Sequence, residues 1–156
     1  MEYGIKELKE NYEKLAKKHK LPGFDELNQN FDIEKIDRES RVLLKHVRKV
    51  VMEKIVNSLS FLEMLLNPMN VPRMYMVYVN SMRESDRKLV SEIYSQFSDL
   101  IVLSLDREVE YDEKKEAELI VKITSVWNKN KEEIKKILEG VKKPVSNEKV
   151  EKNYFG

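Results

Sequence analysis

The stretch RVLLKHVRKVVMEKI, residues 41–55, decides the fold class, because its apolar residues recur every three or four positions. These positions mix odd and even numbers, so the period of two that a half-buried strand needs is absent. From Leu44 to Leu66 the apolar positions take six steps over 22 residues. The mean of about 3.7 residues per step exceeds the hydrophobic repeat of 3.5 residues in a left-handed coiled coil. We expect a long central helix at about residues 38–66, capped by Asp37 or Ser40, in a globular bundle. Its inward face consists of Leu44, Val47, Val51, Ile55, Leu59, Leu62 and Leu66.

Helical periodicity also marks most of the remaining chain, and the few Gly and Pro residues fall between the periodic segments. A capping box that starts at Ser81 is expected to open one helix, and Asn128–Asn130 to interrupt another. Residues 106–112 are expected to connect two helices, with Val109 and Tyr111 turned inward. The further predicted helices cover residues 4–20, 24–31, 81–105 and 112–141.

The segment NVPRMYMVYVNSM, residues 70–82, fits either a short helix or a buried strand. We favour a helix, with Asn70 as cap and Pro72 in its first turn, because the chain offers no second strand to pair with it. The apolar pattern disappears from Lys143 onward, which predicts a flexible C-terminal tail at 143–156. The chain is therefore expected to be all-α, a single-domain antiparallel bundle of five to six helices over residues 1–142.

Composition limits the class of protein further. The 156 residues suit one domain with one core, and the charged fraction of 37% exceeds the usual ~25%. The Lys and Glu excess fits a protein made at high temperature, and an AT-rich genome explains it equally well. The absence of Cys excludes disulfides, a thiolate nucleophile and Cys-ligated zinc. The short apolar runs and charged N-terminus predict no membrane span and no signal peptide, so we expect a cytoplasmic protein.

The search for catalytic motifs gives no match, so we expect neither enzymatic activity nor a cofactor or metal. His19 and His46 are the only histidines, and neither lies in the Glu-x-x-His or His-Glu-x-x-His patterns of metal sites. The acidic run at 106–112 resembles a calcium loop but has Tyr111 where that loop needs Gly and Ala117 where it needs Glu. An enzyme whose site is assembled from scattered carboxylates and tyrosines stays an open alternative.

A basic stripe on the long helix is the strongest indication of a binding surface. Arg41, Lys45 and Arg48 share one helical face, and Arg38 and Lys49 extend it. Residues of this kind track phosphates in nucleic-acid-binding helices. The alternative, which we favour, is a solvated helix back whose cations pair with the acidic segments 25–39 and 106–118 of the same chain.

Two further groups of residues suggest binding of a protein partner or formation of a homo-oligomer. Methionine and aromatic side chains form adaptable apolar surfaces, although core packing is the commoner use of such residues. At the C-terminus Tyr154 and Phe155 are either random ends or a short docking motif. The residues of the first group are Met74, Tyr75, Met76 and Tyr78.

Part of the chain resembles the helical domain of GINS replication subunits. The resemblance covers about residues 21–105 and rests on an LP-x-F segment, on an Arg-Lys run and a Lys-Ile pair in the long helix, and on a Ser-Met-x-x-Glu-type cap. The small β-domain of that family has no counterpart here. The resemblance implies a nucleic-acid-associated subunit that bridges replication proteins. The sequence as a whole favours a non-enzymatic interaction or assembly protein, with the nucleic-acid-associated subunit as the alternative. The matching residues are Leu21, Pro22, Phe24, Arg48, Lys49, Lys54, Ile55 and Ser81 to Glu84.

Overall fold

The fold is all-α, as the sequence predicts, and is seen in a computed structural model that describes residues 2–36, 41–67, 69 and 71–143. No strand occurs among these residues. The segment at 70–82 forms a helix, so the favoured interpretation of it is confirmed. The elements are α1 (Glu2–His19), α2 (Phe24–Phe31), the 3-10 turn η1 (Ile33–Lys35), α3 (Leu43–Leu66), α4 (Arg73–Ser81), α5 (Glu84–Val109) and α6 (Glu113–Lys142).

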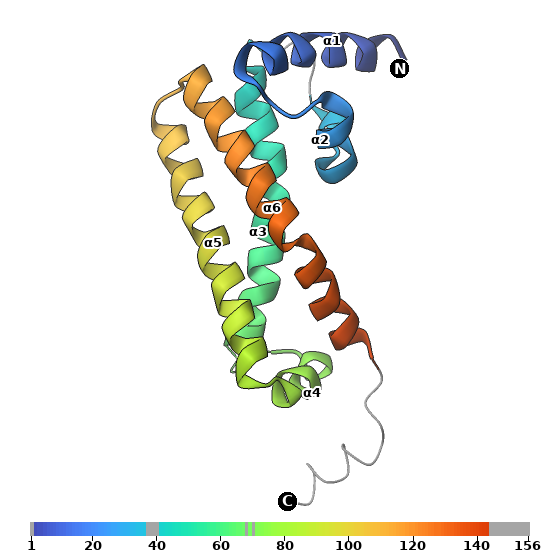
Figure 1. The fold of residues 1–156 in the computed structure, drawn as a ribbon, viewed down its shortest axis with the longest axis vertical. Helices are drawn as coiled ribbons and strands as arrows, with labels where there is room; N and C mark the ends of the chain where they lie inside the picture. Colours follow the sequence, from blue (N-terminus) through green and yellow to red (C-terminus); the bar gives the residue numbers. More distant parts are fainter. Residues whose placement is uncertain (1, 37–40, 68, 70, 144–156) are drawn as a thin grey trace, which may run out of the picture.

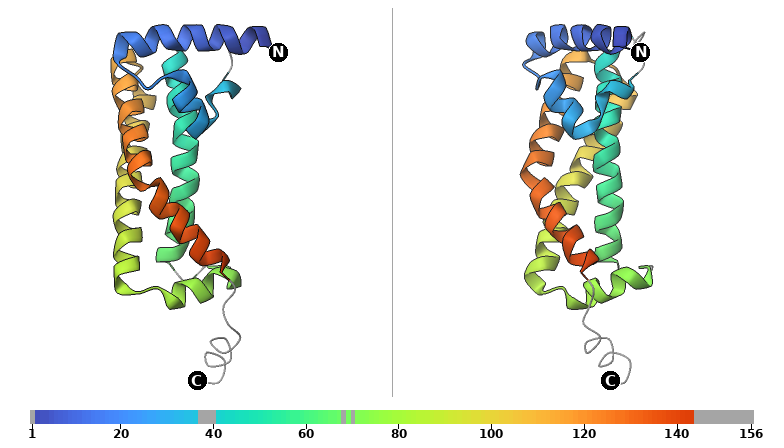
Figure 2. Two further views of the ribbon diagram at one scale, coloured as in Figure 1. Left: turned by 45° about the vertical axis from the view of Figure 1, so that its right-hand side comes forward. Right: turned by 90° about the vertical axis from the view of Figure 1, so that its right-hand side faces the viewer.

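Three long helices, α3, α5 and α6, lie side by side and contact one another along their lengths (Figure 1). The chain reverses direction between α3 and α5 and again between α5 and α6, so α5 is antiparallel to both neighbours. Helix α1 crosses one end of this bundle and α4 lies at the other end (Figure 2). The central core residues are Leu44, Val51, Ile55, Ile93, Phe97, Leu100, Ile120, Ile123 and Trp127.

Helices α3 and α5 begin later than predicted, and at α5 a different side chain provides the cap. Helix α5 begins at Glu84, since Met82 and Arg83 have extended backbones. The Asp86 carboxylate accepts a hydrogen bond from the Arg83 amide at 2.9 Å, and the Ser81 hydroxyl donates to the end of α4 instead. The capping box predicted from Ser81 is therefore wrong. Helix α3 begins at Leu43 rather than at residue 38, and its predicted caps at 37 and 40 lie outside the described residues.

Two predictions about breaks are corrected, because α5 continues into the predicted connection and α6 has no interruption. Helix α5 extends to Val109, so the connection is shorter than predicted and spans residues 110–112. Val109 is 86% exposed and Tyr111 is 40% exposed, so the prediction that both turn inward is wrong. Helix α6 is continuous through 128–130. Its buried Asn130 donates to the Gln96 side chain and to the carbonyl of Val126, both at 2.9 Å, which satisfies the amide without any interruption.

Candidate functional site

Arg48, the centre of the predicted basic stripe, lies inside the bundle and is only 1% exposed. Its guanidinium donates to both carboxylate oxygens of Glu116, at 2.6 Å from Nε and 3.3 Å from Nη2, and to the Ser104 hydroxyl at 2.8 Å. Glu116 is fully buried. Arg48 follows Leu44 by four positions and precedes Val51 by three, so it belongs to the inward series as well as to the stripe.

Two other cations of the stripe, Lys45 and Lys49, lie beside Glu108 at the edge of the buried pair. Glu108 accepts a hydrogen bond from Arg48 at 2.8 Å, and the ammonium groups of Lys45 and Lys49 are each 3.7 Å from its carboxylate. The hydrogen bond from Arg48 holds the pKa of Glu108 below its ordinary value. Arg41 is exposed, and Arg38 lies outside the described residues. Much of the stripe is thus paired with the acidic segment 106–118 of the same chain.

A second buried arginine, Arg107, extends this polar cluster. Its Nη2 donates to Asp106 at 2.6 Å, whereas its Nη1 is buried and has no hydrogen-bond partner among the described residues. The proximity of Glu116 and Asp112 adds to the effect of Asp106, and together they raise the pKa of Arg107. The sequence predicts that the stripe pairs with segment 106–118, but not that Arg48, Arg107 and Glu116 are buried. The only local signal of the cluster is that Glu116 precedes Ile120 by four positions and therefore shares the inward face of α6.

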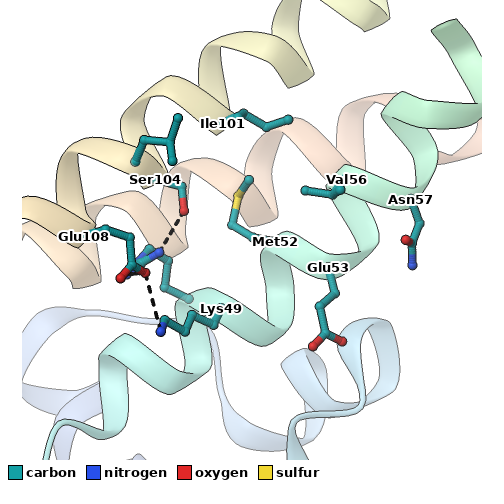
Figure 3. Close-up of a pocket in the computed structure, with 10 residues that line it drawn as sticks. Lys49, Met52, Glu53, Val56, Asn57, Ile101, Ser104 and Glu108 are labelled. Atoms are coloured by element: carbon teal, nitrogen blue, oxygen red, sulfur yellow. Dashed lines mark hydrogen bonds and ion pairs between the residues drawn. The ribbon is translucent and has the colours of Figure 1, made fainter.

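A shallow groove of about 500 Å³ lies between the outer faces of α3 and α5, beside this cluster (Figure 3). Met52 and Val56 of α3 and Ile101 and Leu105 of α5 form its apolar walls, and Glu108 lies at one end. The helical spacing of α5 continues the apolar surface beyond the groove, where Val102 and Val109 are 65% and 86% exposed. We call the outward side chains of α3 and α5 that surround this groove the α3–α5 face.

The predicted partner-binding residues of α4 divide into an exposed and a packed pair. Met74 and Met76 are 69% and 39% exposed. Tyr75 meets Phe61 edge to face with ring centroids 6.2 Å apart, and Tyr78 packs against Gly140 of α6. The tyrosines therefore attach α4 to the bundle. The predicted residues Tyr154 and Phe155 lie outside the described residues.

His19, one of the two histidines of the sequence, has a structural role. His19 Nε2 lies 2.7 Å from the Glu113 carboxylate, and this contact ties the end of α1 to the start of α6. Within the described ranges, no three His, Asp or Glu side chains gather in a way that could hold a metal ion. No helix in that part of the chain has the length and apolar character needed to cross a membrane.

Comparisons with models of protein families, with curated proteins and with solved structures found no match for this chain. The resemblance to GINS subunits stays a prediction.

Proposed function

We propose that this protein is a non-enzymatic helical interaction protein that binds a protein partner through the α3–α5 face. One observation carries the proposal: Val102, Leu105 and Val109 are 65%, 61% and 86% exposed and follow one side of α5 at spacings of three and four. An unpartnered apolar stripe of this kind is typical of a surface that another helix covers.

The groove gives this stripe a shape that a partner helix fits. Its walls are apolar, and the exposed Val56 of α3 and Leu105 of α5 both line it. Removing apolar surface from water stabilises a complex by about 25 cal/mol per Å² before the losses of association are subtracted. An amphipathic helix with apolar residues three and four apart would contact both walls at once.

The polar groups near the groove support a structural role rather than a catalytic one. Arg48 donates hydrogen bonds to the carboxylates of Glu116 and Glu108 and to the Ser104 hydroxyl. Groups that satisfy one another in this way hold helices together and leave little unpaired capacity for a substrate.

Photo-crosslinking in cells that express the protein tests the proposal. A photoreactive amino acid at position 105 should give discrete crosslinked products. The same amino acid at Ser125, an exposed position on α6, serves as the matched control. The Val102→Asp change should reduce the products from position 105. Equal products from both positions would refute the α3–α5 face as the interaction surface.

The alternative, a nucleic-acid-associated subunit, is supported by the exposed Arg41 and by Lys45 beside it. Fluorescence anisotropy with short DNA and RNA at low and near-physiological salt tests it. A charge reversal of Arg41 and Lys45 should abolish salt-sensitive binding, whereas reversal of Lys122 on α6 should not. Arg48 is unsuitable for this test, because its loss disturbs the core. Absence of binding at low salt would refute the alternative.

A further inference from the structure

We propose that a second copy of this chain covers the α3–α5 face, with a two-fold axis that passes beside Val56 and perpendicular to α3. The inference rests on the proposed function, since it names the partner for that same surface. Two features carry it: the order of charges along α3, and the size of the face.

The charges along α3 are complementary to themselves when the helix is reversed. Lys49, Val56 and Glu63 are seven residues apart, all three are exposed, and they share one helix face with a drift of about 20° per step. Each step covers about 10.5 Å along the axis. A cation therefore lies on one side of Val56 and an anion lies at the same distance on the other side.

A two-fold axis beside Val56 turns this order into two ion pairs. It places Lys49 of each copy opposite Glu63 of the other and brings the two Val56 side chains together. Glu63 forms no ion pair within the described part of the chain, and Lys49 reaches only Glu108, at the long distance of 3.7 Å. The other acidic group on this side of α3, Glu53, is already paired with Lys35 at 2.8 Å. Both members of the new pair are therefore available.

The apolar side chains and the size of the face agree with this arrangement. The same rotation lays one groove against the other, so that Val102 and Leu105 of each copy leave the solvent. Helices of 24 and 26 residues are about 36 and 39 Å long. Two such helices set about 8–10 Å apart present a face close to the ~800 Å² per partner of a standard interface.

The oligomeric state of the purified full-length chain provides the first test. Analytical ultracentrifugation over a range of concentrations should show a species of twice the 18.6 kDa chain mass. The Val56→Asp change places two carboxylates at the axis and should raise the dimer Kd by about a hundredfold or more. The matched control is Val121→Asp, at an apolar position on α6 that is 40% exposed and should leave Kd unchanged.

A charge swap tests the register of the two copies. Lys49→Glu and Glu63→Lys should each weaken the dimer by about tenfold, because each creates two like-charge contacts across the axis. An equimolar mixture of the two variants should form a heterodimer, since both contacts then join opposite charges. The double variant should also recover dimerisation. Circular dichroism of each variant checks that the fold is retained.

The outcomes separate this inference from the proposed function. A monomeric wild-type chain at about 100 µM would overturn the second-copy inference. If Val102→Asp still reduced crosslinking to another protein, the proposed function would stand without it. A dimer that neither Val56→Asp nor the charge swap affects would also overturn the inference, because the copies would then meet through another face.

Discussion

The replacement of Arg48 by Met is expected to destabilise the fold by about 3–5 kcal/mol, because it leaves a buried carboxylate without its counter-charge. The side chains of Arg48 and Glu116 are 2% and 0% exposed, and two hydrogen bonds join them at 2.6 and 3.3 Å. Glu108 adds less, since its side chain is 39% exposed and water screens it. For a domain of this size the loss corresponds to a decrease in Tm of about 6–20 °C.

A double variant shows whether the pair itself or the volume of the side chains is responsible. Arg48→Met together with Glu116→Leu removes both charges at similar volume, and should recover to within about 2 kcal/mol of the wild-type free energy of unfolding. The matched control, Lys122→Met, changes an exposed residue on α6 and should shift that free energy by at most about 0.5 kcal/mol. Urea unfolding followed by far-UV circular dichroism measures all four proteins. A single variant within about 1 kcal/mol of wild type would refute the reasoning, and so would a double variant no more stable than the single one.

Two further predictions concern the ends of α6. The hydrogen bond from His19 holds the pKa of Glu113 below its ordinary 4.5, so the contact contributes stability above pH 4.5 that is lost as the pH falls through the folded pKa. Glu113→Gln should be less stable than wild type at pH 7, by under about 1 kcal/mol because the group is partly exposed. Denaturant titrations should show that this difference in the free energy of unfolding vanishes in acid. An unchanged difference at low pH would contradict the prediction. At the other end, a Cβ on Gly140 would lie 2.7 Å from the Tyr78 ring. Gly140→Ala should therefore loosen the packing of α4, which would be measured as faster amide hydrogen exchange. In a Tyr78→Ala background the same change should stabilise the protein by about 1 kcal/mol, because Ala has the higher helix propensity. Equal effects in both backgrounds would argue against the close packing.

Much of the fold could be predicted from the sequence because the apolar spacing is a local property. The positions Val51, Ile55 and Ile93 lie in the core as the period requires. Helix ends were less predictable, because several polar residues compete to cap each one. Asp86 caps α5 although Ser81 offers the better sequence signature, and the difference follows from the extended backbone between them.

The candidate site was less predictable, because it depends on contacts between distant residues. Arg48 and Glu116 are 68 positions apart, and nothing in the local pattern of either shows that they pair. Without Glu116, an arginine in a basic stripe is most simply a solvated residue. The groove likewise depends on how α3 and α5 pack, which the spacing within each helix does not determine. Val109 illustrates the limit: its inward prediction assumed a connection where α5 in fact continues.

The burial of Arg48 changes what the outside of α3 can recognise. If its charge faced solvent, the first half of α3 would form a continuous cationic surface suited to phosphates. With that charge paired to Glu116, the outer face alternates instead, from Lys49 through the apolar Val56 to Glu63. A surface of mixed sign around an apolar centre discriminates between partners by register rather than by net charge. The buried pair also bridges α3 and α6, while Ser104 links Arg48 to α5, so one arginine holds the three helices whose relative positions define the groove. In the proposed function, the polar core would therefore act on recognition through geometry, and the exposed apolar stripe would supply the binding free energy.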